Sequence, residues 1–510
     1  MKNTRIALIV VNTFVLMFLS GVHSAAGQDI IGKLITGYQG WFSCEGDESP
    51  VTGWRHWGKG DNMPYPGFGN LSFELYPDMR EYETGYQAGF ANLGNGQPAT
   101  LFSSYDDQVV NTHFKWMAEN GIDVAALQRF GSSIGSTSKM GHKDGVARKV
   151  RSAAEQYDRK FFIMWDLSSW TDFQTELKSD WTDVLVGELD LLSSPSYAKE
   201  DGKPVVCVWG FGSSGRPGDQ ASWTDVITWL QAQGCFVIAG CHKFWRTTPE
   251  ILGAVQNADM ISPWYVGTFS NSGTDNWYAD KVKPDIAYCA ANGLHFMPTV
   301  WPGFAWSNWN TKDGVPAPQN QHPRLHGEFM WKQFYLAKQK FNEVEGTTAT
   351  IYVSMFDEYD EGTAIAKAAE DVSMIPTNQY FLTLDADGVH CSSDFYLRLT
   401  ADGAKMMKGE IALTSTHPTP YVPGPTSNSD IHGGMDDGNS RVKIFPNPAS
   451  GVVRINTYRE NTDIALFDLS GKQLIQKMHV SADAELDVSD IQAGVYVLKV
   501  DNAFHKLIIE

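Results

Sequence analysis

Short apolar runs alternate with longer amphipathic stretches along most of the chain. The amphipathic stretches repeat their apolar residues with a helical period, whereas the apolar runs are rich in β-branched and aromatic residues, which is typical of strands. Eight runs are expected to be strands: 34–42, 122–130, 160–166, 204–210, 235–241, 259–266, 295–301 and 348–356. Helices are expected between them at 107–120, 145–157, 223–233, 249–257, 276–292 and 323–341.

The order of these elements predicts an α/β fold with parallel strands. Continuous apolar runs indicate strands covered on both faces, and strand-helix-strand alternation gives parallel pairing through right-handed crossovers. Eight such units within residues 27–412 predict a (β/α)8 TIM barrel. An open doubly wound sheet is the alternative, but no glycine-rich phosphate-binding turn follows any of the runs. The long aromatic segment 43–100 follows the first strand, where loops of such a barrel shape the active-site face.

The first 26 residues have the pattern of a secretory signal peptide. Lys2 and Arg5 precede an apolar run at 6–19, and small residues follow at Ala25 and Ala26. The apolar run is short for a membrane span, and no later stretch reaches eighteen uninterrupted apolar residues. The sequence therefore predicts export and no transmembrane segment.

The composition changes after the predicted barrel. Residues 413–440 are rich in Pro, Ser, Thr and Gly and are expected to form an exposed linker, and short alternating strands in 441–510 predict a small β-sandwich. A carbohydrate-binding module is the alternative for this segment, but it contains no Trp for stacking on sugars.

Four stretches of this segment, 445–448 (FPNP), 466–472 (LFDLSGK), 486–488 (LDV) and 494–498 (GVYVL), resemble the C-terminal sorting domain of type IX secretion substrates. The resemblance implies that residues 441–510 are a partner of the type IX secretion machinery. It also implies passage through the outer membrane, followed by surface attachment or release.

Charge and cysteine spacing exclude several functions. The chain carries 40 Lys and Arg residues against 59 Asp and Glu residues, a formal net charge of −19, whereas a nucleic-acid partner needs a basic face. The six cysteines are scattered without the Cys/His spacing of a zinc site, so no metal and no cofactor are expected. Export permits a disulfide, but the spacing does not choose one.

The eighth apolar run leads into four carboxylates, Asp357, Glu358, Asp360 and Glu361. Neighbouring carboxylates push their pKa values apart, so that one stays protonated as an acid while another stays ionised as a base. Cleavage of a glycosidic bond requires this division of labour. A solvated acidic turn or a cation site is the alternative, but the position at the end of a barrel strand favours catalysis.

Aromatic and polar residues also end several of the other runs. At the catalytic rim of a barrel they would line one cleft, whereas the alternative for each is packing. The residues expected to bind substrate are Tyr38, Trp41, Asp166, Trp264, Tyr265, Trp301 and Tyr359.

Residues 356–363 (FDEYDEGT) resemble the Asn-Glu-Trp-His-Glu-Gly-Thr signature of glycoside hydrolase family 99, whose members are endo-α-mannosidases and α-mannanases with (β/α)8 barrels. The resemblance implies that Glu361 is the general acid and that Glu358 is a general base acting on the substrate's own 2-hydroxyl. That route gives a 1,2-anhydro sugar and retention, and it suits mannose. The chain departs from the signature at Asp357, Tyr359 and Asp360, so its segment is more acidic than the signature. Family 71, which cleaves α-1,3-glucan, ends its last strand with a similar motif.

The resulting hypothesis is a secreted retaining endo-glycoside hydrolase that cleaves an α-linked, α-mannan-like polysaccharide. Its alternatives are a family 71-like α-1,3-glucanase and a noncatalytic surface protein that binds glycans. A β-linked plant or algal glycan is a further possibility because the segment 43–100 could reshape the site.

Overall fold

The computed structural model describes residues 28–423, 443–445, 449–456, 462–468, 472–481, 483–500 and 503–509. The predicted signal peptide, residues 1–26, lies outside the described residues, and so do residues 424–440 of the predicted linker. The chain forms two compact units, one ending at Tyr421 and one beginning at Val422, and each is described by itself.

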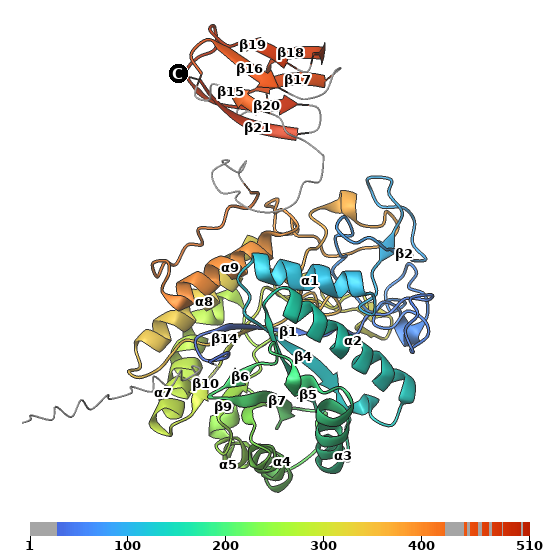
Figure 1. Ribbon diagram of the computed structural model, residues 1–510, viewed down its shortest axis with the longest axis vertical. Helices are drawn as coiled ribbons and strands as arrows, with labels where there is room; N and C mark the ends of the chain where they lie inside the picture. The colour runs from blue at the N-terminus through green and yellow to red at the C-terminus, as the bar shows by residue number, and fades with distance from the viewer. Residues whose placement is uncertain are drawn as a thin grey trace, which may run out of the picture. The chain divides into compact units, whose positions relative to one another are not determined.

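Parallel strands of the first unit close into a ring, which is the predicted (β/α)8 barrel (Figure 1). The seventh strand of the ring is interrupted at Met297 and Pro298: its first half pairs with the sixth strand and its second half with the eighth. The eighth strand then pairs with the first, so the ring has no open edge and the open-sheet alternative is wrong. The strands in order are β1 (Leu34–Tyr38), β4 (Val124–Phe130), β5 (Lys160–Asp166), β7 (Lys203–Phe211), β8 (Phe236–Cys241), β9 (Met260–Pro263), β10 (His295–Phe296) with β11 (Thr299–Val300), and β14 (Ile351–Val353).

Helices surround this ring (Figure 1). In the first of them Val109, Val110, Phe114 and Met117 are buried, at the spacing that places side chains on one face of a helix. The helices are α1 (Asp107–Glu119), α2 (Thr137–Gln156), α3 (Phe173–Ser179), α4 (Gln220–Ala232), α5 (Pro249–Val255), α6 (Thr274–Trp277), α7 (Lys283–Ala291), α8 (Glu328–Asn342) and α9 (Phe395–Lys408). π-helical turns at Asp180–Glu188 and Tyr278–Val282 continue α3 and α6.

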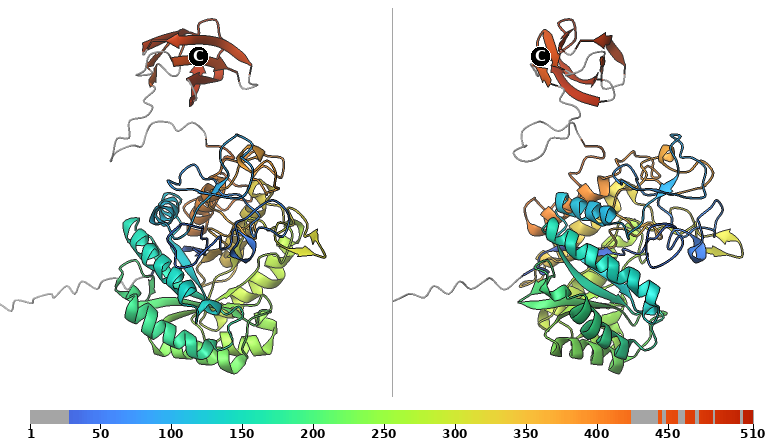
Figure 2. Two further views of the ribbon diagram at one scale, coloured as in Figure 1. Left: turned by 90° about the vertical axis from the view of Figure 1, so that its right-hand side faces the viewer. Right: turned by 45° about the vertical axis from the view of Figure 1, so that its right-hand side comes forward.

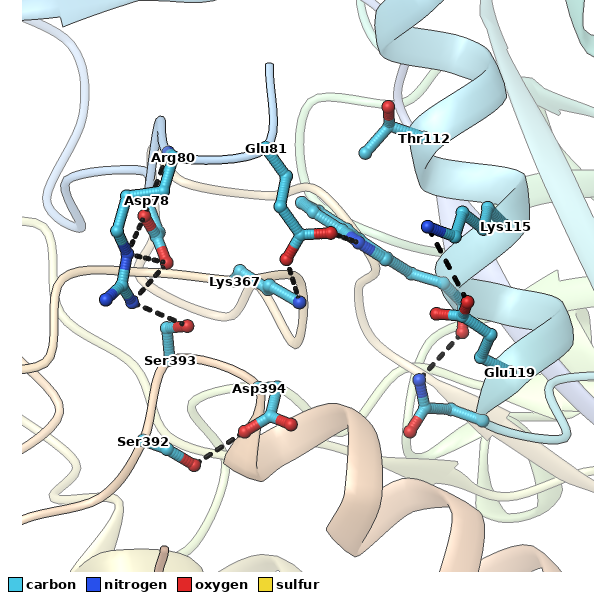
Figure 3. A network of polar contacts seen from close by, with 12 residues as sticks. Asp78, Arg80, Glu81, Thr112, Lys115, Glu119, Lys367, Ser392, Ser393 and Asp394 are labelled. Atoms are coloured by element: carbon cyan, nitrogen blue, oxygen red, sulfur yellow. Dashed lines mark hydrogen bonds and ion pairs between the residues drawn. The ribbon is translucent and has the colours of Figure 1, made fainter. Parts of the chain in front are cut away.

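The segment 43–100 packs on the chain that follows β14. It contains a 3-10 turn at Lys59–Asp61 and a short pairing of β2 (Tyr86–Gln87) with β3 (Thr100–Leu101). A second short ribbon, β12 (Thr311–Lys312) with β13 (Val315–Pro316), lies after β11. Ion pairs fasten the segment: Arg80 pairs with Asp78, and Lys367 pairs with Glu81 (Figure 3). Arg80 also pairs with Glu370.

The second unit is a small antiparallel all-β domain with two sheets. One sheet has the order β15-β16-β19 and the other β18-β17-β20-β21. Val453 and Leu486 of the first sheet and Leu466 and Leu498 of the second belong to one buried cluster, which is the core of a β-sandwich. The strands are β15 (Lys443–Phe445), β16 (Val452–Asn456), β17 (Thr462–Phe467), β18 (Gln473–Val480), β19 (Asp483–Asp487), β20 (Gly494–Val500) and β21 (Ala503–Ile509).

The barrel unit extends beyond the predicted boundary at residue 412. Backbone carbonyls of the predicted linker accept hydrogen bonds from the barrel: Trp331 Nε1 donates to Thr414 at 2.9 Å and Arg398 Nη1 to Pro420 at 2.7 Å. The Pro- and Thr-rich composition suggested an exposed linker, but its carbonyl groups remain good acceptors for side chains of α8 and α9. Residues 413–421 therefore belong to the barrel unit.

All six cysteines lie within the described residues, and every one is buried and free. They behave as small apolar side chains of the barrel, and no disulfide joins them. In the part of the chain that the structure covers, no helix has both the length and the apolar character needed to cross a membrane.

Candidate active site

The acidic segment turns back over the end of β1, and Asp357 fixes this turn. Its Oδ1 accepts a hydrogen bond from the Gln39 N–H at 2.7 Å, and its Oδ2 accepts one from the Gly40 N–H at 2.9 Å. Burial raises the pKa of Asp357 to about 6, against the opposite effect of these two bonds. Asp357 thus joins the eighth strand to the first and sets the position of the residues that follow it.

Glu358 is buried and lines a cavity. Its Oε2 accepts a hydrogen bond from Gln39 Nε2 at 2.6 Å, while its Oε1 has no partner among the described residues. Burial, followed by the charge of Glu361, raises the pKa of Glu358 well above its ordinary value. The Gln39 amide lowers the same pKa because an N–H donor favours the ionised carboxylate.

Glu361 lines the same cavity and is more exposed than Glu358. Burial raises the pKa of Glu361 to about 7, and the guanidinium of Arg216 opposes this shift. Because each charge disfavours the other, the two glutamates bind a proton between them more readily than isolated carboxylates do. A protonated and an ionised carboxyl on one cavity can donate and accept protons in the same reaction.

The cavity has a volume of about 190 Å³, and its lining residues lie at the carboxyl ends of the barrel strands. The predicted residues Trp41, Asp166 and Trp264 lie in its wall, together with the two glutamates. The other lining residues are Gln39, Gln128, Phe130, Met164, Trp209, Arg216, Met355 and Thr363.

Four other residues expected to bind substrate do not line this cavity. Tyr38, Tyr265, Trp301 and Tyr359 are each fully buried. The Tyr38 hydroxyl bonds His113 Nδ1 of α1 at 3.0 Å, and the Tyr359 hydroxyl donates to the Lys367 carbonyl at 3.0 Å. Trp301 lies edge-on to Phe329 of α8 at 4.7 Å between ring centroids. These four side chains are packed in the barrel unit, where the Tyr265 hydroxyl and Trp301 Nε1 have no hydrogen-bond partner among the described residues.

The difference between Tyr38 and Gln39 has a simple cause. Successive side chains of a strand point to opposite sides, so Tyr38 at the end of β1 points outward to α1 and the next residue points inward. Gln39 could have been identified from this alternation. Arg216 could not, because it lies in a loop rich in Gly and Ser after β7, where periodicity carries no signal.

Aromatic contacts hold the cavity wall. Trp41 stacks on His56, with centroids 3.7 Å apart and planes inclined by 6°, and His56 Nδ1 lies 3.0 Å from Asp360 Oδ2. On the opposite side, the Arg216 guanidinium lies 4.5 Å from the ring centroid of Trp209. The two tryptophan walls are therefore fixed before any ligand binds.

Six residues that line this cavity each have a buried polar atom without a hydrogen-bond partner among the described residues, and further such atoms lie elsewhere in the barrel. Native proteins pair nearly all such atoms, so a cluster of unpaired ones marks a place where a ligand or water completes the bonds. The set contains both donors and acceptors, as a ligand with many hydroxyl groups requires. The atoms are Gln39 Oε1, Trp41 Nε1, Trp209 Nε1, Arg216 Nε, Glu358 Oε1 and Thr363 Oγ1.

A metal centre has no counterpart in the described ranges, which contain no group of three or more His, Cys, Asp or Glu side chains placed to hold an ion. The side chains of Asp357 and Asp360 instead contact the backbone of Gln39 and Gly40 and the ring of His56.

Comparison with known proteins agrees with both units. Residues 443–510 match the family model described as secretion system C-terminal sorting domain. Comparison with curated protein sequences gives no match.

The barrel is similar to solved structures of the GH99 endo-α-mannosidase from Bacteroides thetaiotaomicron. The complex with bis-tris-propane has a TM-score of 0.52 and 16% sequence identity, and the match covers 75% of this chain and 98% of that one. A second structure of the same enzyme has a TM-score of 0.51 and 16% identity and covers 74% and 98% of the two chains. The chain thus combines a barrel with the fold of these GH99 structures and a C-terminal type IX sorting domain, which marks proteins that are exported to the cell surface or secreted.

Proposed function

We propose that the protein is an exported retaining endo-glycoside hydrolase that cleaves an α-linked, mannan-like polysaccharide. The observation that supports this most is the pair Glu358 and Glu361 on one cavity, both with raised pKa values. The unpaired donors and acceptors around the pair suit the hydroxyl groups of a sugar ring. The sorting domain agrees with a substrate outside the cell.

The hydrogen bonds suggest which glutamate has which role. Burial raises the pKa of both glutamates, but Glu358 accepts a hydrogen bond from the Gln39 amide N–H, which favours its ionised form and supports Glu358 as the base toward the 2-hydroxyl of the sugar. Glu361, whose pKa is about 7, holds the proton and delivers it to the departing glycosidic oxygen. Once Glu361 is protonated, its charge no longer disfavours ionisation of Glu358, so the two roles support each other.

The α-mannoside preference rests on the family 99 resemblance and on the GH99 endo-α-mannosidase fold. The experiment is a polysaccharide panel that includes α-mannan, α-1,3-glucan and β-mannan, read by release of reducing ends and by NMR of the first product. We expect cleavage of α-mannan with retained anomeric configuration. Cleavage of α-1,3-glucan alone would assign the family 71-like activity, inversion would exclude the 2-hydroxyl route, and binding without product would assign a noncatalytic role.

The pH dependence should follow the Glu361 carboxyl. Since a general acid must be protonated, kcat/KM is expected to fall as the pH rises through about 7, where Glu361 loses its proton. Arg216→Met removes the positive charge that lowers the pKa of Glu361, so the alkaline limb should move to higher pH by roughly one unit. Arg216→Lys keeps a positive charge and is the matched control. A limb that stays in place in Arg216→Met would contradict the assignment of that limb to Glu361.

A further inference from the structure

The loop after β11 carries an exposed tryptophan directly beside the acidic segment. Trp309 is 36% exposed, although its indole Nε1 donates to the Asp360 carbonyl at 3.1 Å. Four residues earlier, the Ala305 N–H donates to the Glu361 carbonyl at 3.0 Å. The loop is thus bonded on both sides to the residues that carry the proposed catalytic pair.

Glu74, from the segment 43–100, holds this loop in place. Its Oε1 accepts from the Ser307 hydroxyl at 2.7 Å, its Oε2 accepts from the Asn308 N–H at 2.8 Å, and its own N–H donates to the Tyr359 carbonyl at 2.9 Å. Glu74 is fully buried, and burial raises its pKa to about 7 in spite of these bonds. Burying a carboxylate costs free energy unless donors pair with it, and a surface turn does not ordinarily contain one. Here the buried carboxylate fixes the loop that carries Trp309.

The ring of Trp309 is held without being covered. Trp306 makes a T-shaped contact with it, with centroids 5.3 Å apart, and Trp309 keeps 36% of its surface exposed. The Asn308 carbonyl accepts from the Gly69 N–H at 2.6 Å, which joins the loop to a neighbouring stretch with exposed Tyr65 and Phe68. Figure 2 shows the yellow hairpin β12–β13, which follows Trp309, projecting from the barrel unit.

We propose that Trp309 is a glycan-binding subsite outside the cavity, on which a pyranose ring of the bound chain stacks next to the scissile bond. This inference rests on the proposed function, since it takes the occupant to be the same polysaccharide. A flat apolar ring face suits the C–H face of a sugar, and a ring held in advance loses little conformational freedom on binding. The bond to Asp360 places the subsite beside Glu361, so it engages a sugar that extends beyond the cavity.

The test compares Trp309→Ala, Trp309→Phe and Val315→Ala, each in the Glu361→Gln background, by titration calorimetry with α-mannan oligosaccharides of increasing length. Val315 is an exposed apolar residue of the hairpin that follows Trp309 and is the matched control. We expect Trp309→Ala to weaken binding of the longer chains by about tenfold and to leave the disaccharide unchanged, since stacking contributes roughly one factor of ten. Trp309→Phe should keep most of the affinity, and Val315→Ala all of it.

Kinetics of the same substitutions in the otherwise unchanged enzyme separate stacking from a structural role. Trp309→Ala should raise KM on polymer with kcat nearly constant, whereas a displaced acidic segment would lower kcat. Equal affinity of Trp309→Ala and the parent for long chains overturns the subsite while the hydrolase stands. Length-dependent binding that is lost in Trp309→Ala, without cleavage by the unsubstituted enzyme, overturns the hydrolase and supports the subsite. A parent that binds none of the oligosaccharides overturns both.

Discussion

Glu361→Gln should lower kcat/KM on the cleaved polysaccharide by at least about 100-fold, because a positioned general acid contributes roughly 10²- to 10⁴-fold. Glutamine has nearly the same size, and Glu361 is a cavity residue with part of its surface exposed, so the fold should be unaffected. What the substitution removes is the transferable proton. Initial rates on polymer, together with the melting temperature, measure the two effects separately.

Glu345→Gln is the matched control, since it makes the same chemical change at an exposed position outside the site. Glu358→Gln should cost a comparable factor, because the base toward the 2-hydroxyl is lost. An aryl glycoside with a good leaving group needs little acid assistance, so it should rescue cleavage in Glu361→Gln more than in Glu358→Gln. Full activity of Glu361→Gln on polymer would remove Glu361 from the mechanism.

Arg129→Met should destabilise the barrel by about 3–5 kcal/mol, the cost of removing one partner from a buried ion pair. Arg129 is 2% exposed, and its Nε and Nη2 donate to the two oxygens of Asp180 at 2.7 and 2.6 Å. Its Nη1 donates to Asp144 Oδ1 at 2.8 Å. Methionine fills similar volume but leaves the buried Asp180 carboxylate without its counter-charge.

Urea unfolding followed by tryptophan fluorescence measures this effect on the barrel alone, since the segment 441–510 contains no Trp. Arg148→Met removes an exposed pair with Glu188 and should cost no more than about 1 kcal/mol. Arg129→Met/Asp180→Leu should recover much of the lost free energy of unfolding, because no charge is then left buried. Equal midpoints for Arg129→Met and Arg148→Met would show that the buried pair is not a stabilising element.

The barrel could be predicted because its information is local. Each strand is a short apolar run, and the alternation with helices fixes parallel order, so all eight runs became strands of one ring. Local pattern did not show that Pro298 divides the seventh strand, nor that residues 413–421 pack on α8 and α9. Both depend on hydrogen bonds between residues distant in the sequence.

The sequence predicted the part of the candidate site that lies in one cluster of carboxylates. It did not predict the residues whose position depends on tertiary contacts. Four carboxylates after a strand identified Glu358 and Glu361, and their catalytic roles remain a prediction. Aromatic residues at strand ends were a weaker guide: Trp41 and Trp264 reached the cavity, but Tyr265 is fully buried outside it. Glu74 and Trp309 come from separate connections that meet only in the folded chain, so neither had a signal in the sequence.

The six buried thiols can report local unfolding of the barrel. Burial raises the pKa of Cys207, Cys241 and Cys289 above the ordinary thiol value, which leaves almost no reactive thiolate in the native state. An alkylating dye can therefore modify them only when strands and helices separate. A reductant should not lower the stability of the native barrel, and refolding should not require one. The rate of dye incorporation measures how often the barrel unfolds locally.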